Sequence, residues 1–384
     1  MDSADVAIVG AGPAGSAAAI MLAAQGLRVA LLEAQRHPRR KPCGESVNPG
    51  AVQALARLGL PPAAFFHGDS VRIRGWRLHY GRSLLEADFP GARLGMSCPR
   101  EQLDQWLASE AVRAGAELME DARVDGLIRE AGRVAGVTYR LASGRPRELR
   151  APLVIGADGL RSRIARAAGL SRAGRLRKAS FTFHTEAFDE IGDRIELHLQ
   201  KEIVVGLVPV GGGLANMTIG VMGEHAKHAA GRTEAFVKET ASRLPYLSNR
   251  LLHVKPVDEV LACGPFDRPN AAAAAGVMLI GDAAGYYDPL TGQGIYKALR
   301  SAELAAPHAL AALRSGLDWP LQQYSLRLRD EFAASGRLQR MIEYGTRHPL
   351  LFRGALGGLR WNRRMRDRIA ASIGDIGLEH EVGE

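Results

Sequence analysis

The sequence has few cysteines and no long hydrophobic run, and both absences narrow the class of protein. Cysteine occurs three times in 384 residues, as Cys43, Cys98 and Cys263. This odd, widely spaced set is neither a disulfide framework nor a metal-binding pattern, so we expect no metal site and a location in the reducing cytoplasm. No uninterrupted apolar run reaches about 18 residues, so no transmembrane helix is expected. The acidic residues 1–5 do not resemble a signal peptide, and any membrane contact would be peripheral.

Patterns of directly catalytic side chains are also absent. The chain has no Ser-His-Asp arrangement and no carboxylate pair placed for acid–base catalysis, as expected where an organic cofactor supplies the reactivity. The formal net charge is +9, with arginine in excess near the C-terminus. A generic basic surface and an attraction for anionic substrates or a membrane surface both explain this charge. No segment resembles a nucleic-acid-binding module, so no nucleic acid partner is expected.

A glycine fingerprint near the N-terminus predicts a dinucleotide site. Gly10-Ala11-Gly12-Pro13-Ala14-Gly15 lies between a buried-strand run and a helix of small residues. Gly10 permits a tight turn, Gly12 lets the backbone approach a pyrophosphate, and Gly15 lets helix and strand pack closely. The helix N-terminus adds partial positive charge for the phosphates. Glu33 ends the next strand, 18 residues beyond Gly15, where its carboxylate can accept hydrogen bonds from ribose hydroxyls.

A second glycine-rich segment far downstream predicts the other end of the same ligand. Asp282 follows the apolar run 277–280, so it should lie at the carboxyl edge of the sheet, where it can bind a ribityl hydroxyl. Pro289 fixes the loop, and Gly292-Gln293-Gly294 bring bare backbone to the pyrimidine edge of a flavin. The helix that begins there and runs through Ile295 can stabilise negative charge on the reduced ring. FAD is the common cofactor that fits both ends.

The hydrophobic pattern predicts an α/β fold. Apolar strand runs that alternate with helices predict a Rossmann-type FAD-binding domain. Alternating strands over 180–222 predict an inserted, mostly antiparallel β-sheet that forms a substrate domain, and arginine-rich helices follow. The predicted boundaries are 1–70, 97–175 and 264–320 for the discontinuous FAD-binding domain, 71–96 and 176–263 for the substrate domain, and 321–384 for the C-terminal helices.

Three motifs in this order resemble those of a known family. Gly156-Ala157-Asp158-Gly159 follows a further predicted strand and is similar to the Asp-Gly motif of flavoprotein hydroxylases. Together with the two glycine-rich segments, it resembles the class A FAD-dependent monooxygenases of the p-hydroxybenzoate hydroxylase fold over nearly the whole chain, the C-terminal helices excepted. Lys41-Pro42-Cys43-Gly44-Glu45, Gly285 and Asp288–Ile295 resemble the geranylgeranyl reductase-like flavoproteins of the same family instead.

The resemblance implies roles for several further residues. Asp158 would support FAD, although an Asp that turns the chain and caps the next helix is the alternative. Arg100 would lie beside FAD, where a guanidinium suits a pyrophosphate, unless it is a surface arginine. Cys43 and Glu45 would lie on a loop that passes the isoalloxazine, as a flavin contact or proton donor and as the group that orients it. A packing cysteine and a solvated glutamate are the alternative.

Two reactions remain open at this point. We expect an NAD(P)H-driven FAD monooxygenase that hydroxylates a hydrophobic aromatic or polyketide-derived specialised metabolite, with NADPH or NADH as reductant. The alternative is a geranylgeranyl reductase-like enzyme that reduces isolated C=C bonds of a prenyl chain, and a non-catalytic FAD-stabilised scaffold is a third. Halogenation is not expected, because the Trp-x-Trp-x-Ile-Pro segment of tryptophan halogenases is missing. His184 and His198 lie on strand faces that would either roof the flavin or face solvent. No pattern indicates an oligomeric state.

Overall fold

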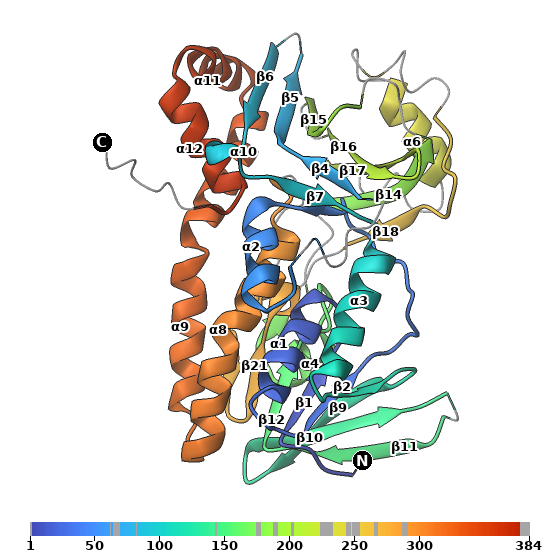
Figure 1. The fold of residues 1–384 in the computed structure, drawn as a ribbon, viewed down its shortest axis with the longest axis vertical. Helices are drawn as coiled ribbons and strands as arrows, with labels where there is room; N and C mark the ends of the chain where they lie inside the picture. Colours follow the sequence, from blue (N-terminus) through green and yellow to red (C-terminus); the bar gives the residue numbers. More distant parts are fainter. Residues whose placement is uncertain are drawn as a thin grey trace.

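A six-stranded sheet forms the centre of the computed structural model (Figure 1). Its order is β20-β21-β12-β1-β2-β8, and all neighbours are parallel except β20 and β21. The strands span Ala273–Ala274 (β20), Val277–Leu279 (β21), Leu153–Gly156 (β12), Val6–Val9 (β1), Val29–Leu32 (β2) and Glu117–Met119 (β8).

The structure describes residues 2–61, 63, 70–81, 83–142, 144–173, 178–186, 191–200, 203–222, 233–242, 247, 254–264, 268–285 and 291–376.

Two different layers cover the central sheet. One face packs against α1 (Pro13–Ala23), α3 (Arg100–Arg113) and α8 (Gly294–Ser315), with α2 (Pro49–Arg57) beside α8. The other face packs against α4 (Arg163–Ala167) and an antiparallel sheet of β11 (Pro146–Arg150), β10 (Arg133–Arg140) and β9 (Arg123–Glu130). Because both faces are covered, every residue of β1, β2 and β12 is buried, as is typical of parallel sheets.

A seven-stranded sheet lies at one end of this layered core (Figure 1). Its order is β18-β14-β17-β16-β15-β5-β6, and only β15 and β5 pair in parallel. One face buries Phe183 and Val205 with α6 (Thr233–Ser242), and the other buries Trp76 and Leu197 with the C-terminal helices. The strands span Leu261–Cys263 (β18), Lys178–Glu186 (β14), Leu214–Met222 (β17), Ile203–Gly211 (β16), Arg194–Gln200 (β15), Gly75–Tyr80 (β5) and Ser83–Asp88 (β6).

Short elements connect the two sheets. Strand β7 contacts both α2 and β16, so it lies where the central layers meet the seven-stranded sheet. It is the middle strand of β3-β7-β4. The remaining short elements are β3 (Ser46–Val47), β4 (Val71–Ile73), β7 (Gly95–Ser97), β13 (Ser171–Arg172), β19 (Arg268–Pro269) and the single turns η2 (Pro90–Ala92) and η3 (Gly281–Ala283).

In the part of the chain that the structure describes, four helices follow α8 and lead to the seven-stranded sheet. They are α9 (Trp319–Glu331), α10 (Ala333–Arg347), α11 (Pro349–Trp361) and α12 (Arg363–Ile373). Helix α8 ends at Gly316 in the left-handed conformation (φ +68°), which turns the chain so that α9 packs along α8. Helices α11 and α12 then contact β6. Within the described part of the chain, no helix combines the length and the apolar composition that crossing a bilayer requires.

The predicted fold class is confirmed, and several strands are additional. The Rossmann-type core, the mostly antiparallel sheet and the C-terminal helices are all present, while the proposed domain boundaries stay a prediction. The longest of the strands that were not predicted are β6 and β9, and β8 and several two- or three-residue strands are the others. Strand β9 alternates weakly because its register against β10 shifts between Val124 and Gly126 and because Leu127 and Ile128 are consecutive apolar residues, and it is stabilised by its long pairing with β10. The parallel pairing of β5 with β15 joins segments more than a hundred residues apart, which local patterns cannot reveal.

Candidate cofactor and active site

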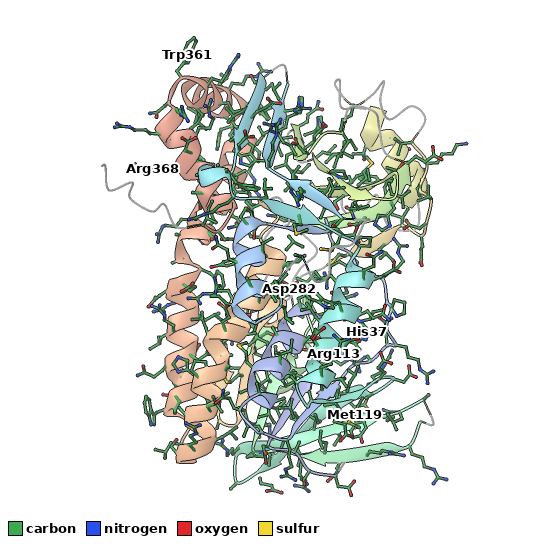
Figure 2. All side chains as sticks on the ribbon, in the orientation of Figure 1. His37, Arg113, Met119, Asp282, Trp361 and Arg368 are labelled. Atoms are coloured by element: carbon green, nitrogen blue, oxygen red, sulfur yellow. The ribbon has the colours of Figure 1, made fainter. Side chains whose placement is uncertain are left out.

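Three sequence motifs meet at one edge of the central sheet. Strands β21, β12 and β1 are neighbours and parallel, so Asp282, Asp158 and Gly10 all follow carboxyl ends at the same edge. The two glycine-rich segments touch there, because a side chain added at Gly281 would lie 2.9 Å from Cβ of Ala14. In this fold class ligands bind outside the carboxyl ends of the strands. Figure 2 shows Asp282 in the middle of the molecule, between the helical layer and the seven-stranded sheet.

The first glycine loop has the geometry that its sequence predicts. Gly10 has φ +103°, and a Cβ there would lie 2.5 Å from the carbonyl oxygen of Ala157. A Cβ on Gly15 would lie 1.8 Å from the oxygen of Gly10, so helix α1 can approach β1 only without that atom. Gly12 differs, because the atoms nearest to its Cβ position belong to flexible side chains, Nη2 of Arg39 at 3.7 Å and Nη2 of Arg100 at 4.0 Å. Its backbone therefore faces cations.

Glu33 ends β2 beside this loop. Its Oε2 accepts hydrogen bonds from the backbone N–H of Ala11 at 2.9 Å and from Nη2 of Arg39 at 3.1 Å. The side chain is buried, with 9% of its surface exposed. The carboxylate thus lies at the glycine loop, where the sequence places it, while its bond to a ribose stays a prediction.

Three cationic side chains converge on the loop. Arg39 is buried beside Glu33 and Asp104, and its Nε has no hydrogen-bond partner among the described residues. Arg100 binds Asp104 through two bonds of 2.8 Å. Burial lowers the pKa of Lys41, as do the like charges of Arg39 and Arg100. Such a cluster fits a diphosphate, which would neutralise the charges and accept the free N–H. Of these three cations, the sequence analysis identified only Arg100 as a cofactor residue. The basic run at 39–41, on the loop that follows β2, is a signal that could have indicated the other two.

Asp282 lies in η3, directly after β21. Burial raises the pKa of its carboxyl group, and the positive charges of Lys297, Arg100 and Lys41 oppose this shift. Lys297 lies on α8 and donates to the carbonyl oxygen of Gly285. Burial lowers the pKa of Lys297 to about 7, although Asp282 raises it. The carboxylate therefore lies in a field of cations at the place where a ribityl chain is predicted, and Lys297 is a member of the site that sequence reasoning missed.

Helix α8 begins at the second glycine segment. Gly294 has no atom within 4 Å of its Cβ position, so the helix N-terminus is open there. Ile295 lies in the core beneath it. The Nε2 of Gln293 donates to the carbonyl oxygen of Ser372 at 2.8 Å and to Oδ1 of Asp375 at 2.6 Å, so the amide group of this side chain is held by the C-terminal segment. Pro289, with Tyr286, Tyr287 and Asp288, lies outside the described residues.

The C-terminal segment joins two loops of the site. Asp375 accepts from Gln293 and, through Oδ2, from Nδ2 of Asn48 at 2.7 Å. The backbone N–H of Gly50 donates to the oxygen of Gly374 at 2.8 Å. Burial raises the pKa of Asp375 to about 8, against the effect of these two donors. We call the set Asn48, Gln293 and Asp375 the C-terminal clasp. No sequence pattern indicates it, because its members lie in three distant segments.

Asp158 is occupied within its own loop. Its Oδ1 accepts from Oγ of Ser162 at 2.5 Å, and its Oδ2 accepts from the backbone N–H of Arg163 at 2.7 Å. Ser162 caps α4 by accepting from the N–H of Ala165. These contacts match the alternative interpretation of a turn and helix cap, whereas support of FAD by the Asp158 side chain stays a prediction.

The segment Cys43-Gly44-Glu45 lies beneath the seven-stranded sheet. Nδ2 of Asn216 on β17 donates to the carbonyl oxygen of Cys43 at 2.9 Å, and Oγ1 of Thr218 lies 3.8 Å from the Cβ position of Gly44. The N–H of Glu45 donates to Sγ of Cys43 at 3.3 Å. Burial raises the pKa of the Cys43 thiol, while the positive charge of Arg100 lowers it. Cys43 is therefore a protonated thiol at neutral pH.

Glu45 is the buried end of a chain of titratable groups. Its Oε1 accepts from the N–H of Arg100 at 2.9 Å, and its Oε2 lies 2.6 Å from Nε2 of His184. Nδ1 of His184 lies 2.6 Å from Oδ2 of Asp258, which pairs with Arg40 at 2.8 Å. The hydrogen bond that His184 donates to the Glu45 carboxylate raises the pKa of His184 to about 9, although burial lowers it. Glu45 is thus not a solvated glutamate, and Asp258 was not identified from the sequence.

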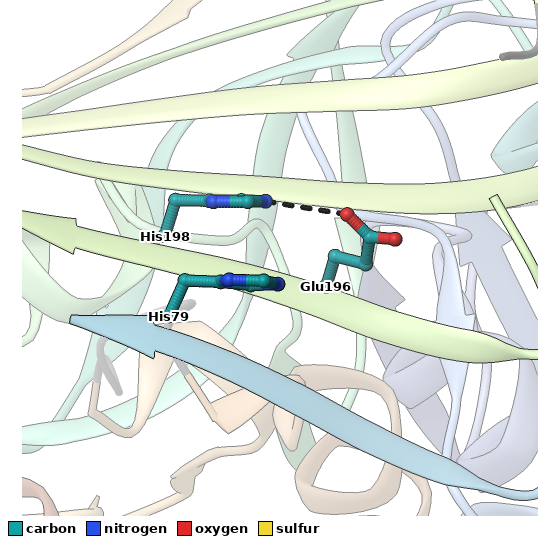
Figure 3. A group of neighbouring side chains, drawn as sticks. All are labelled: His79, Glu196 and His198. Carbon is teal, nitrogen blue, oxygen red and sulfur yellow. Dashed lines mark hydrogen bonds and ion pairs between the residues drawn. The ribbon is translucent and has the colours of Figure 1, made fainter. Parts of the chain in front are cut away.

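His198 lies on the opposite face of the same sheet. Residues 184 and 198 are both buried, so neither faces solvent, but only His184 faces the Cys43 loop. His198 stacks on His79 with ring centroids 4.4 Å apart and planes 6° apart, and its Nε2 lies 3.2 Å from Oε2 of Glu196 (Figure 3). The ligand-type atoms of these three lie within 4.8 Å of one another. A metal ion binds in the plane of an imidazole, and two parallel planes cannot share one ion, so we assign the cluster a structural role.

The residues present fit FAD. The open glycine loop, the hydrogen-bond donor left on Arg39 and the convergent cations suit a diphosphate. Asp282 and the open N-terminus of α8 lie at the far end of the same edge. Cys43 and Glu45 lie between these ends and the seven-stranded sheet, which is where a reactive ring held at both places would lie.

Comparisons with known proteins agree with this geometry. The family model described as "FAD binding domain" matches residues 3–334. A digeranylgeranylglycerophospholipid reductase of Methanothrix thermoacetophila is 32% identical over 326 residues, which cover 81% of this chain and 79% of the relative. A myxobacterial chondrochloren halogenase has a similar structure, with a TM-score of 0.81 at 23% identity over 89% of this chain and 82% of that one.

A geranylgeranyl bacteriochlorophyll reductase-like protein of Thermoplasma acidophilum is also similar, with a TM-score of 0.74 at 24% identity over 100% of this chain and 94% of that one. At such identities the solved structures show the fold alone. The family match is more specific, because it contains both glycine-rich segments and the Asp-Gly motif. The chain is an FAD-dependent oxidoreductase, and it belongs to the family of flavoproteins that carry this FAD binding domain.

Proposed function

We propose that this protein is a reductase that saturates isolated C=C bonds of prenyl chains in a lipid. The observation that carries the proposal is the 32% identity to a digeranylgeranylglycerophospholipid reductase over 81% of the chain. The halogenase is less similar and supports only the fold. Of the two reactions that the sequence leaves open, reduction therefore has better support than hydroxylation. NADH or NADPH is the proposed source of electrons.

Reduction of an isolated double bond adds a hydride to one carbon and a proton to the other. When bound and reduced, FAD supplies the hydride. We assign the proton to the Cys43 thiol, whose S–H bond breaks as the new C–H bond forms, leaving a thiolate. Burial raises the pKa of Cys43, so the thiol carries this proton at neutral pH. The charge of Arg100 and the N–H of Glu45 both favour the thiolate that remains.

The thiolate must then recover a proton, and the chain from Glu45 to Asp258 supplies a route. Asp258 has 24% of its side chain exposed, whereas Glu45 has 5% and His184 has 11%. The links from Asp258 to His184 and from His184 to Glu45 are both 2.6 Å contacts, which are typical of strong charge-assisted hydrogen bonds. The proposed last step, from the Glu45 carboxylate to the thiolate, joins residues two positions apart, of which Glu45 already donates its backbone N–H to Sγ of Cys43. In this proposal His184 and Asp258 are positioning residues that keep a proton available and Glu45 oriented beside Cys43.

The test uses FAD-loaded protein, a digeranylgeranylglycerophospholipid and NADH, NADPH or dithionite, with and without oxygen. We expect an anaerobic product that has gained two hydrogen atoms for each reduced bond, measured by mass spectrometry. A product that forms only in air and contains an atom of isotopically labelled O₂ would contradict the reductase and favour the monooxygenase. If FAD is reduced but the lipid is recovered unchanged in both atmospheres, prenyl lipids are not the substrate.

A further inference from the structure

Helices α10 to α12 expose large apolar side chains at one end of the molecule. Trp361 is 92% exposed, Leu350 82% and Leu351 65%. Figure 2 shows Trp361 pointing outward beyond α11. We call this surface the C-terminal face, and its exposed apolar members are Met341, Tyr344, Leu350, Leu351, Trp361 and Met365. Six of the thirteen large apolar side chains that are exposed in the described part of the chain lie on these three helices, and a concentration of exposed apolar side chains on one part of a surface is typical of an interaction site.

The fold does not require these side chains. The same helices anchor themselves through their inner side, where Leu356, Ala370 and Ile373 are buried with Trp76 and Tyr80 of the seven-stranded sheet. Phe352 packs edge-on against Tyr80, with ring centroids 4.8 Å apart. Because the inner side already attaches the helices, the outer side is available for a partner.

The C-terminal face is also strongly basic. Residues 333–376 contain nine arginines, at 337, 340, 347, 353, 360, 363, 364, 366 and 368, against the carboxylates of Glu343, Asp367 and Asp375. The segment therefore carries a net charge of +6, most of the +9 of the whole chain. Asp375 is buried in the clasp. Glu343 and Asp367 pair with Arg347 and Arg363, so the arginines of these helices are in large excess over the carboxylates that could neutralise them.

We propose that the C-terminal face docks the protein on an anionic lipid surface. Arginine binds lipid phosphates through paired hydrogen bonds, and a tryptophan is favoured at the boundary between headgroups and acyl chains. Apolar side chains interspersed with basic ones on short helices are typical of helices that lie in the membrane interface. A protein partner would need carboxylates to match the guanidinium groups, whereas an anionic bilayer supplies both the charge and the apolar layer. This docking does not depend on which reaction the flavin performs.

The experiment measures co-sedimentation of the FAD-loaded protein with vesicles. Vesicles of phosphatidylcholine alone are compared with vesicles that also contain phosphatidylglycerol, at low and high salt. One variant carries Leu350→Ser, Leu351→Ser and Trp361→Ser, and another carries Arg360→Gln, Arg363→Gln and Arg364→Gln. The matched control carries Leu317→Ser, Leu326→Ser and Trp319→Ser, which changes two leucines and one tryptophan that are 52–56% exposed at and near α9. Bound FAD and mass in solution are measured for each protein.

We expect salt-sensitive binding to the phosphatidylglycerol vesicles, little binding to phosphatidylcholine alone, and a loss of about tenfold or more in both test variants. The control variant should bind like the original protein, and all should keep FAD. Three outcomes would overturn the proposal. The first is no binding to the anionic vesicles, and the second is an equal loss of binding in the control variant. The third is a test variant that changes a dimer into a monomer without affecting vesicle binding, because the face would then be a subunit interface.

Discussion

His184 and Glu45 are 139 residues apart in the sequence, yet Nε2 of the histidine lies 2.6 Å from Oε2 of the glutamate. This contact joins the seven-stranded sheet to the loop that carries Cys43. Because Asp258 binds the other ring nitrogen, the imidazole lies between two carboxylates and is a cation at neutral pH. The sheet and the cofactor loop are therefore connected by a charge that depends on pH.

The first prediction concerns stability against pH. The pKa of His184 in the folded protein is raised from 6.5 to about 9, chiefly by its hydrogen bond with Glu45. Because the folded protein binds this proton more tightly than the unfolded chain, protonated His184 adds about 1–3 kcal/mol to the free energy of unfolding. This contribution is complete below about pH 6.5 and is lost as the pH rises through about 9. In His184→Gln, the free energy of unfolding, measured by urea titration at several pH values, should change less over this pH interval than in the original protein. His308→Gln on α8 is the control, and an equal flattening there would refute the assignment.

The second prediction concerns the proton donor. Cys43→Ser should lower anaerobic double-bond reduction by about 10²- to 10⁴-fold, because a general acid contributes on this scale. FAD content and flavin reduction by NAD(P)H should change much less. Cys263→Ser, at a half-buried thiol, is the control. If Cys43→Ser keeps its rate within about tenfold, or roughly 1.4 kcal/mol of barrier, the thiol is not the acid.

The third prediction concerns the ribose end of the cofactor site. Glu33→Ala removes the acceptor for the N–H of Ala11 and for Arg39, together with the bonds expected to ribose. FAD should bind more weakly by about 1–3 kcal/mol, the cost of losing a buried hydrogen-bonded group, measured by fluorescence titration of the apoprotein. Glu148→Ala, at an exposed position on β11, should not change affinity. Unchanged affinity in Glu33→Ala would remove this residue from the site.

The fourth prediction concerns Asp282. Asp282→Ala should weaken FAD binding and lower turnover, because the ribityl chain loses its acceptor. The substitution should also lower the pKa of Lys297 to below about 7, because the Asp282 carboxylate raises this pKa in the original protein. FAD content of the purified protein and the rate of flavin reduction test the first effect. Normal FAD content with normal turnover would show that Asp282 only shapes its loop.

The fifth prediction compares two glycines with positive φ. Gly10→Ala places a Cβ 2.5 Å from the backbone oxygen of Ala157, whereas Gly26→Ala finds no atom within 4 Å. Both pay the strain of the left-handed region, about 1 kcal/mol. Only Gly10→Ala should lose a further few kcal/mol and its FAD, as measured by thermal unfolding and absorbance. Equal losses at both positions would mean that strain alone accounts for Gly10.

The sequence predicts the parts of the fold that local patterns encode. Gly10 and Gly15 indicate the first strand–turn–helix correctly because their steric requirements are local. Gln293 and Asp158 also lie where expected, but their side chains serve the C-terminal clasp and a helix cap. A motif fixes where the backbone runs, and the use of each side chain depends on neighbours that the motif does not contain.

The least predictable members of the site are held by long-range contacts. Asp258 accepts hydrogen bonds from the backbone N–H and from the ring of His184. It lies in a short connecting segment whose sequence has neither helical nor strand periodicity. Arg39 is recognised only once Asp104 and Glu33 are seen on either side of it. The two histidines of the sheet show the same limit, since alternation along a strand separates two faces but does not say which face meets the cofactor.

The C-terminal clasp has a consequence for how the protein is made. Asn48 and Gln293 bind Asp375, so two loops of the cofactor site are held by a residue that is synthesised 327 positions after Asn48. Segments that are synthesised first generally fold first, and the central sheet is complete once β21 at residues 277–279 has been made, whereas the clasp also needs Asp375. We therefore expect the loops at Asn48 and Gln293 to reach their final arrangement only after Asp375 has been synthesised.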